Sequence, residues 1–363
     1  MDQEKILRRI MQERILIFDG SMGSYLSGFG LKAGDFGGHE GLNEYLSVSR
    51  PDVIKKVHLD YLTAGADVVE TNTFGANRFV LAEYGLEGKV RELNLAAVKL
   101  AGEAARALST PERPRFVAGS VGPTNKALYV LGGATFDEFT EVYLEQMAAL
   151  AEGGADILLV ETAHDISNIK AALAAASKLF SRSGRSLPVI VSVTMDRNNV
   201  MLSGQNTESV CAALEHFPLL ALGFNCSTGP KDMALRLETL SKTSRFPVMA
   251  MPNAGLPDEN GKYGETPEGF SAAMRKYADD GLLNAAGGCC GTVPAHIKAL
   301  ASALEGVRPG RTAAGHRWAV SGVEVLFYDE IEPPLLVGER NNSIGSKKFR
   351  DVVAAGEWDK AVE

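Results

Sequence analysis

Three of the four cysteines lie in two short segments that each follow a strand-like apolar run. Cys226 ends the run 221–226 in the segment GFNCSTGP, and Cys289 and Cys290 are adjacent in GGCCGT. Adjacent residues of a regular strand point to opposite faces, but the flanking glycines allow the backbone to leave strand geometry. Both sulfurs can then face one point. Three thiolates with one open position are typical of catalytic zinc, whereas structural zinc usually has four protein ligands.

A zinc site of this kind predicts activation of a substrate thiol. Zinc deprotonates a bound thiol. Three thiolates and one divalent ion carry about one negative charge, so the metal polarises water poorly but leaves a fourth, substrate thiolate nucleophilic at neutral pH. We therefore expect a substrate thiolate to attack an electrophilic carbon, and hydrolysis fits less well.

The cysteines also have less specific interpretations. Buried cysteines often pack as small hydrophobic residues, which is the expected role of Cys211 in a helical stretch and an open alternative for the other three. A vicinal disulfide between Cys289 and Cys290 is another alternative, as is a redox site. No Cys-x-x-Cys motif is present to support redox chemistry.

Strand-like and helix-like segments alternate through the first 307 residues. The strand-like runs are mostly continuously apolar, as in parallel strands covered on both faces, and the segments between them have the apolar spacing of amphipathic helices. Gly65 and Gly154 are expected to end two of these helices. Eight such units predict a (β/α)₈ TIM barrel. The alternative, a doubly wound open sheet, is disfavoured because no Gly-x-Gly-x-x-Gly loop follows the first run. The expected strands are 15–20, 66–74, 115–122, 155–163, 188–195, 221–226, 247–255 and 283–291.

Polar residues gather where these strands should end. The active site of a (β/α)₈ barrel forms at the carboxyl ends of its strands. An ordinary barrel core does not require polar side chains there, so the residues at these ends are candidates for function or for anchoring loops. They are Asp19, Glu70, Asn72, Thr73, Glu161, Thr162, Asn225 and Asn253, together with the three cysteines.

Composition argues against several classes of protein. Of the 363 residues, 45% are hydrophobic and 23% are charged, which is typical of a folded globular chain. The net charge of −8 argues against nucleic acid or an anionic membrane as the main partner. The charged N-terminal segment lacks the apolar core of a signal peptide, and no apolar run approaches the roughly 18 residues of a membrane span. A cytoplasmic location is expected.

The barrel pattern ends near residue 307, so residues 1–307 are expected to form the barrel domain. Residues 308–320 contain Pro, Gly and basic residues and predict a linker. Residues 321–363 are too few to bury a second core of their own. They are expected to be a short C-terminal extension, the truncated start of another domain.

The motifs along residues 10–305 resemble the homocysteine S-methyltransferase family. The combination of Asn-Cys with Gly-Gly-Cys-Cys-Gly is the most specific part of the resemblance. Within the family, the chain is most similar to the N-terminal homocysteine-binding modules of the cobalamin-dependent methionine synthases. The matching motifs are FDGSMGS (18–24), ETNTFGAN (70–77), SVGPT (120–124), VET (160–162), GFNCSTGP (223–230), PNAG (252–255) and GGCCGT (287–292).

The C-terminal extension carries a further part of the resemblance. The segment VGERNNSIGSKKFRDVV (337–353) is similar to the start of the pterin module, which binds methyltetrahydrofolate, although Asn341 stands where Thr or Ile is more usual. The resemblance thus implies folate-binding and cobalamin-binding domains as partners, in the same chain or in another protein.

The resemblance implies methyl transfer to the thiol of homocysteine, which gives methionine, with methylcobalamin on another domain or protein as donor. It implies that Cys226, Cys289 and Cys290 hold Zn²⁺ and that the homocysteine sulfur takes the fourth position. It also implies that the side-chain oxygen of Asn253 fills that position when substrate is absent.

The resemblance further assigns residues to the two charged groups of the substrate. Asp19 and Glu161 match the carboxylates that bind the substrate ammonium, which suits two anions at the barrel mouth. General acid and base catalysis by this pair is the alternative. The candidates for the substrate carboxylate are Thr73 and the backbone amides around Gly20, Ser21 and Ser24.

Two other functions stay open. One is a homocysteine methyltransferase that uses S-methylmethionine or betaine. An aromatic donor pocket would favour this function, but aromatic residues are only 7% of the chain, which counts against it. A non-catalytic zinc or thiol-binding docking module would have a closed metal shell and no affinity for homocysteine. His164 lies near the expected barrel mouth and could approach the substrate. The other polar or aromatic residues are expected to have packing or hydrogen-bonding roles in the fold; they are Glu70, His58, His216, Tyr25 and Phe74.

Overall fold

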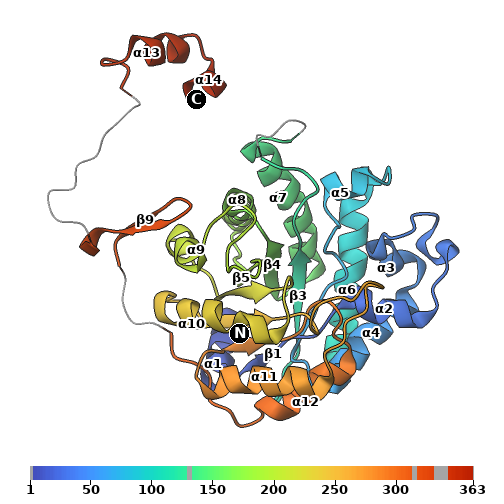
Figure 1. Ribbon diagram of the computed structural model, residues 1–363. Helices are drawn as coiled ribbons and strands as arrows, with labels where there is room; N and C mark the ends of the chain where they lie inside the picture. Colours follow the sequence, from blue (N-terminus) through green and yellow to red (C-terminus); the bar gives the residue numbers. More distant parts are fainter. Residues whose placement is uncertain (1–2, 129–132, 313–316, 331–341, 363) are drawn as a thin grey trace. The chain divides into compact units, whose positions relative to one another are not determined.

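Eight parallel strands form a closed barrel surrounded by helices (Figure 1). The computed structural model describes residues 3–128, 133–312, 317–330 and 342–362. The strand order is β1-β8-β7-β6-β5-β4-β3-β2, so each strand pairs with its neighbours in sequence and β1 with β8. The ring closes where Phe18 pairs with Val68 and the Asp67 amide donates to the Ile17 carbonyl at 2.7 Å. The predicted (β/α)₈ TIM barrel is confirmed.

The strands are short and the helices between them longer. The barrel strands are β1 (Leu16–Ile17), β2 (Val68–Glu70), β3 (Phe116–Val121), β4 (Ile157–Ala163), β5 (Val189–Val193), β6 (Ala221–Asn225), β7 (Val248–Met251) and β8 (Ala285–Ala286). The helices are α1 (Gln3–Glu13), α2 (Met22–Leu26), α3 (Leu46–Ser49), α4 (Pro51–Ala64), α5 (Arg78–Ala82), α6 (Val90–Leu108), α7 (Phe136–Gly153), α8 (Ile166–Ser183), α9 (Thr207–Leu214), α10 (Ala234–Thr243), α11 (Pro267–Asp279) and α12 (Pro294–Leu304).

Local sequence explains where many helices begin and end. At the start of α7, the Thr135 hydroxyl accepts from the Glu138 amide and the Glu138 carboxylate accepts from the Thr135 amide, which satisfies two otherwise free donors. Gly65 and Gly154 end α4 and α7 with φ values of 115° and 94°. These left-handed conformations favour glycine, as predicted for both positions.

Two layers of apolar side chains hold the barrel together. One fills the space between the sheet and the surrounding helices, and the other fills the barrel interior. Helix α1 contributes Leu7, Ile10 and Met11 to the interior layer, and all three are buried. Their spacing puts them on one helical face. The N-terminal segment thus closes the barrel at the end opposite the carboxyl ends of the strands.

Several predicted strands extend beyond the observed ones at their carboxyl ends. The expected run 283–291 contains only β8, and the run 247–255 ends as a strand at Met251. Gly287 and the residues after it turn out of the sheet, and so do Pro252 and Asn253. These polar and glycine-rich ends instead hydrogen-bond to neighbouring loops, which leaves their side chains free to form a site.

The chain divides into two compact units. One contains Met1–His316 and Val320–Val325, and the other contains Arg317–Ala319 and Leu326–Glu363. Helix α13 begins after Ser346, whose hydroxyl accepts from the Phe349 amide. Residues 313–316 of the predicted linker and 337–341 of the pterin-like segment lie outside the described residues. The remaining elements are β9 (Ala319–Ser321), β10 (Val325–Phe327), α13 (Lys347–Ala354) and α14 (Trp358–Val362).

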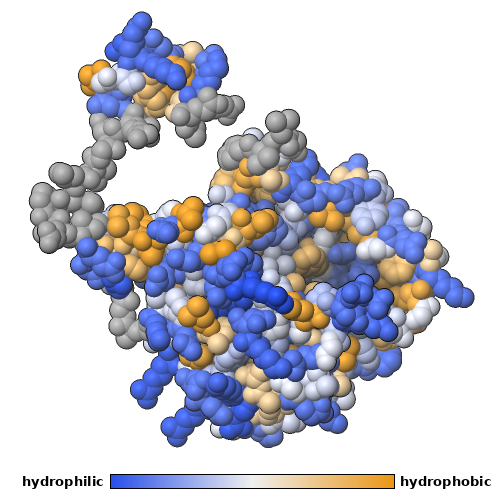
Figure 2. All heavy atoms as spheres, in the orientation of Figure 1, coloured by the Kyte–Doolittle hydropathy of each residue, from blue (hydrophilic) through white to orange (hydrophobic). Residues whose placement is uncertain are grey.

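Hydrophilic residues dominate much of the barrel surface. On the face drawn in Figure 2, hydrophobic residues form separate small groups among them. Within the described part of the chain, no helix combines the length and the apolar character needed to cross a membrane.

Candidate active site at the carboxyl ends of the strands

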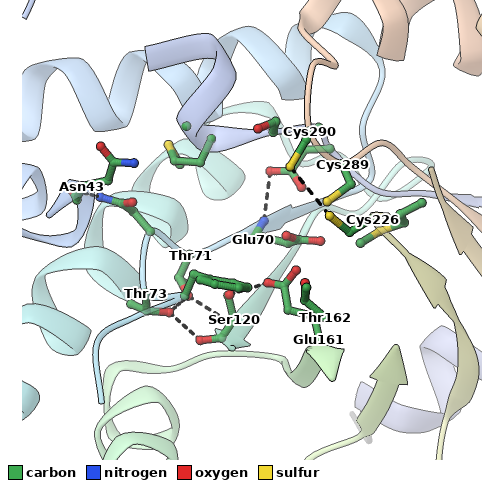
Figure 3. A pocket seen from close by; sticks show the side chains of 18 of the residues that line it. Asn43, Glu70, Thr71, Thr73, Ser120, Glu161, Thr162, Cys226, Cys289 and Cys290 are labelled. Carbon is green, nitrogen blue, oxygen red and sulfur yellow. Dashed lines mark hydrogen bonds between the residues drawn. The ribbon is translucent and has the colours of Figure 1, made fainter. Parts of the chain in front are cut away.

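A cavity of about 270 Å³ lies among the loops that follow the barrel strands. Figure 3 shows sulfur-containing and carboxyl side chains on neighbouring parts of its wall. Much of the wall comes from the polar strand ends that the sequence singled out. The lining residues are Asp19–Gly23, Asn43, Glu44, Glu70–Phe74, Ser120, Glu161, Thr162, Cys226, Met251 and Gly288–Cys290.

Cys226, Cys289 and Cys290, the cysteine cluster, meet at this wall. Their sulfurs all lie within 4.8 Å of one another, and those of Cys226 and Cys290 are 3.8 Å apart. All three are free thiols, so the structure contains no vicinal disulfide between Cys289 and Cys290. Among the described residues, this is the one group of three or more His, Cys, Asp or Glu side chains that lies close enough to share a metal ion.

The backbone after β6 and β8 turns so that the three sulfurs converge. Cys226 and Ser227 both have φ values of 62°, in the left-handed region that is uncommon for residues with a side chain. The Cys226 amide donates to the Met251 carbonyl at 3.1 Å, and the Cys289 amide donates to the Pro252 carbonyl at 2.8 Å. Both cysteine loops are therefore fixed to the end of β7, the strand between them.

The cysteine cluster stabilises a thiolate. Donation from the Cys289 and Cys290 thiols lowers the pKa of Cys226 from 9.0 to about 3. The hydrogen bonds to Cys226 raise the pKa of Cys289 well above its usual value, and they also raise the pKa of Cys290. One sulfur thus carries negative charge that the other two share as donors. A divalent cation suits this set because it replaces the shared protons.

A carboxamide oxygen completes the fit to a metal ion. Asn253 is 3% exposed, its side chain hydrogen-bonds to Cys226, and its Oδ1 is buried without a hydrogen-bond partner. An unpartnered buried carbonyl oxygen is costly unless a ligand takes it up. Three thiols and this oxygen could together supply four ligands to a metal ion such as zinc, and the neutral oxygen would be the weakest of them.

Asp19, Glu70 and Glu161, the carboxyl cluster, occupy the facing part of the cavity. Asp19 is 2% exposed; its Oδ2 accepts from the Glu70 amide at 3.0 Å, and its Oδ1 has no partner. The Glu161 Oε1 accepts from the Ser120 hydroxyl at 2.5 Å. Glu70 has an unpartnered Oε1 and a hydrogen bond to Glu161.

Burial makes ionisation of the carboxyl cluster unfavourable. It raises the pKa of Asp19 and of Glu70 well above their usual values, and the Glu161 charge adds to both shifts. Burial also raises the pKa of Glu161 from 4.5 to about 7. The described residues that line the cavity include no lysine or arginine. A ligand with an ammonium group would supply the missing positive charge.

The sequence model of the homocysteine S-methyltransferases matches residues 16–304, a range that includes every residue lining the cavity. The chain belongs to the homocysteine S-methyltransferase family.

Comparisons with individual proteins agree with this family. The chain is 36% identical over 358 residues to the methionine synthase of Mycobacterium tuberculosis, a match that covers 98% of this chain but only 30% of that protein. Among solved structures, the metallated form of the homocysteine methyltransferase MmuM from Escherichia coli has a TM-score of 0.65 at 26% identity, covering 80% of this chain and 96% of MmuM. Its oxidized form has a TM-score of 0.64 at 27% identity, covering 79% and 95%. The resemblance seen in the sequence is confirmed.

The residues predicted to bind the substrate carboxylate are not all available in this member of the family. Gly20 and Ser21 line the cavity, but Ser24 does not; its hydroxyl accepts from the Gly291 amide at 2.8 Å and from the Ser21 hydroxyl at 3.0 Å. Thr73 lines the cavity, yet its hydroxyl donates to the Ser120 carbonyl at 2.7 Å. Of the predicted backbone amides, that of Ser21 donates to the Thr292 hydroxyl and that of Ser24 to the Ser21 hydroxyl, both at 3.1 Å, so the Gly20 amide is the candidate that remains.

Several residues to which the sequence analysis gave no catalytic role are buried or lie outside the cavity lining. His58 is fully buried, and burial lowers its pKa to about 4. Cys211 is buried on α9, where burial raises the pKa of its thiol to about 12. His164 follows β4 without lining the cavity. Glu70 and Phe74, by contrast, are part of the cavity wall.

Some residues around the sulfurs and carboxyls received no specific role from the sequence, although Asn225 was among the polar candidates at the strand ends. Ser120 holds Glu161, and Asn225 donates through Nδ2 to the Cys289 sulfur at 3.8 Å. Tyr263 hydrogen-bonds to Cys290. Ser120 and Asn225 end predicted strands, which is a weak signal, whereas Tyr263 lies in a polar loop with no distinguishing pattern.

Proposed function

We propose that this chain binds Zn²⁺ through the cysteine cluster and transfers a methyl group from methylcobalamin to homocysteine. The observation that supports this most directly is the convergence of three free thiols beside buried carboxyls that lack a positive partner. A ligand with both a thiol and an ammonium group matches the two halves of one cavity. Homocysteine has these two groups.

Zinc supplies one part of the chemistry: it keeps the homocysteine thiol ionised and nucleophilic at neutral pH. Cys226, Cys289 and Cys290 would hold the ion, and Asn253 Oδ1 would be its weak, exchangeable fourth ligand. Because the metal already promotes loss of the thiol proton, no carboxylate is needed as a general base.

The remaining groups of the protein orient the amino acid. Asp19 and Glu161 accept hydrogen bonds from the ammonium, and Ser120 holds Glu161 toward the cavity. The backbone amides of Gly20, Met22 and Gly23 are the donors for the substrate carboxylate. Binding at both ends would hold the substrate sulfur beside the cysteine cluster, which would remove much of the entropic cost of the reaction.

The identity of the donor rests on relatives and on the cavity wall. The match along 98% of the chain is to a methionine synthase more than three times as long, which supports donor modules outside this sequence. We infer that residues 321–363 begin a pterin domain and that folate-binding and cobalamin-binding domains are partners. Among the described residues that line the cavity, Phe74 is the only aromatic one, so they do not provide an aromatic cage for betaine or S-methylmethionine.

The test is a set of three methyl donors offered to the zinc-loaded protein with homocysteine. We expect methionine from methylcobalamin, but not from betaine or S-methylmethionine. Cys289→Ala should abolish the product and lower the bound zinc. Methionine formed only from S-methylmethionine or betaine would overturn the proposed donor.

A second measurement separates an enzyme from a docking module. Homocysteine should change the zinc-edge X-ray absorption spectrum, because its sulfur replaces an oxygen ligand. Full zinc loading with no spectral change and no product would favour the docking module.

A further inference from the structure

Each sulfur of the cysteine cluster has its own neutral hydrogen-bond donor. Cys226 receives bonds from the Ser227 amide and the Asn253 side chain. Cys289 receives one from Asn225, at 3.8 Å, and Cys290 receives one from the Tyr263 hydroxyl. Asn225 and Tyr263 do not line the cavity, so they act on the sulfurs and not on a ligand.

The Asn225 carboxamide is fixed in the orientation that donates. It is fully buried, and its Oδ1 accepts from the Thr162 amide at 2.9 Å and from the Ser192 hydroxyl at 2.7 Å. Its Nδ2 also donates to the Thr162 hydroxyl at 2.7 Å. A flipped carboxamide would place its NH₂ group against the Thr162 amide, itself a donor. The NH₂ group therefore faces Cys289.

The same carboxamide connects the two clusters. Thr162 has a φ of 55°, which is uncommon for a residue with a branched side chain. The bonds from Asn225 hold Thr162 in this conformation, directly after Glu161 of the carboxyl cluster. One buried side chain thus touches a metal-ligand sulfur and fixes the backbone beside the ammonium subsite.

The Tyr263 ring is held against the backbone that carries Cys290. It lies in the loop between β7 and α11, where Tyr263 pairs with Pro257. Gly291 has a φ of 80°, and a side-chain carbon there would lie 2.2 Å from Cγ of Tyr263. The ring thus occupies the space that any other residue at position 291 would fill, and its hydroxyl reaches the adjacent cysteine.

We propose that Asn225 and Tyr263 are positioning residues that direct methylation to the substrate sulfur by hydrogen-bonding the Cys289 and Cys290 sulfurs. This proposal rests on the proposed function. With a metal ion bound by the cysteine cluster, an incoming methyl group would meet the protein sulfurs as well as the substrate sulfur. A hydrogen bond draws charge from a metal-bound thiolate and makes it a weaker nucleophile, as such bonds tune metal–sulfur centres generally. In the unwanted reaction, a cysteine sulfur would bond the methyl carbon while the bond from that carbon to its donor breaks and the donor leaves with the electron pair.

The cleanest variant is Tyr263→Phe, which removes the hydroxyl but keeps the ring that packs on Gly291. Its matched control is Tyr143→Phe, because Tyr143 donates its hydroxyl to Asn168 and does not line the cavity. Asn225→Asp is the second variant: it retains an acceptor for the Thr162 amide but loses the donor to Cys289. Melting curves verify that each variant folds.

Two readouts do not depend on turnover. With Co²⁺ in place of zinc, we expect the sulfur-to-metal charge-transfer band of Tyr263→Phe to move to longer wavelength, because a sulfur without its hydrogen bond is more easily oxidised. With zinc bound and iodomethane as probe, the cysteine sulfur bonds the methyl carbon and iodide leaves with the electron pair. Methylation of Cys290 should be roughly tenfold faster in Tyr263→Phe, as measured by peptide mass spectrometry.

The outcomes distinguish the two proposals. A shifted band and faster methylation of Cys290 in Tyr263→Phe, and of Cys289 in Asn225→Asp, would support the assignment if Tyr143→Phe behaves as the parent protein. If the parent protein binds metal and homocysteine while both variants keep its band and methylation rate, this inference is wrong and the proposed function stands. If the parent protein binds neither Co²⁺ nor Zn²⁺, both proposals are overturned.

Discussion

Two buried aspartates lie at opposite ends of the same pair of strands and differ in their partners. Asp67 precedes β2 at the N-terminal end of the barrel, and its fully buried carboxylate pairs with Arg14, Arg113 and Arg115. Asp19 follows β1 at the carboxyl end and has an unpartnered oxygen. Each carboxylate also accepts a backbone amide of the neighbouring strand, at 3.0 Å in both cases.

The difference separates stability from function. A buried charge is tolerated when it is paired and hydrogen-bonded, and Asp67 has both kinds of partner. The described residues of its cavity give Asp19 no cationic partner, so its ionised form would be stabilised only by a positively charged ligand. Arginines thus pair with the buried carboxylate at the N-terminal end of the barrel, whereas buried carboxyls at the carboxyl end have no cationic partner. This agrees with the general division of TIM barrels into a stabilising and a catalytic face.

The largest expected effect follows from removing the charge of Asp67. Asp67→Asn leaves three guanidinium groups without their shared anion, and one of them, Arg115, has a side chain only 9% exposed. We expect the free energy of unfolding to fall by about 3 kcal/mol, the lower end for breaking a buried pair, because the other two arginines are partly exposed. Denaturant unfolding measures this loss. The KM for homocysteine should not change in the folded protein, and a raised KM would contradict the division between the two ends.

The matched change at the other end should have the opposite profile. Under the proposed function, Asp19→Asn removes one charged acceptor of the substrate ammonium, worth about 2 kcal/mol, or roughly a 30-fold loss in kcat/KM for homocysteine. Stability without substrate should be unchanged or higher, because a buried and unpartnered carboxylate is removed. Steady-state kinetics and denaturant unfolding on the same preparation test both parts. A loss of stability equal to that of Asp67→Asn would remove the distinction.

Much of the barrel was predictable because its signals are local. Apolar runs, helical spacing and the glycines that end helices, such as Gly65 and Gly154, depend on neighbouring residues alone. The convergence of Cys226 with Cys289 and Cys290 was predictable for a different reason. Once eight strand–helix units are counted, the ends of strands six and eight must lie on one face.

Other parts of the site depend on contacts that local patterns do not encode. The Ser24 hydroxyl is taken by the Gly291 amide, 267 residues away, so its expected place near the substrate carboxylate could not be judged from its motif. Tyr263 reaches Cys290 only because its loop folds over a left-handed glycine. The Asp67 pairing was also missed, since Arg113 and Arg115 resemble ordinary surface residues before a strand.

The carboxyl cluster predicts how stability depends on pH. The pKa of Glu161 rises from 4.5 to about 7 on folding, so between these values the folded protein binds more protons than the unfolded chain. Stability without substrate should therefore fall as pH rises through this window, and the raised pKa values of Asp19 and Glu70 act in the same direction. Melting temperatures across the window measure the effect. Glu161→Gln should flatten the curve, whereas an unchanged slope would contradict this origin.

The smallest expected effect concerns one arginine of the Asp67 group. Arg113 has a side chain 44% exposed and shares its carboxylate partner with two other arginines, so solvent screens its charge and its loss leaves Asp67 paired. Arg113→Ala should lower the free energy of unfolding by less than about 1 kcal/mol and leave kcat and KM unchanged. Arg9→Ala is the control for losing an exposed arginine, since Arg9 contacts only the exposed Glu13 at 3.9 Å. If Arg113→Ala were as destabilising as Asp67→Asn, the stabilisation of Asp67 would depend on Arg113 alone. Its partly exposed ion pair would then contribute far more free energy than solvent screening permits.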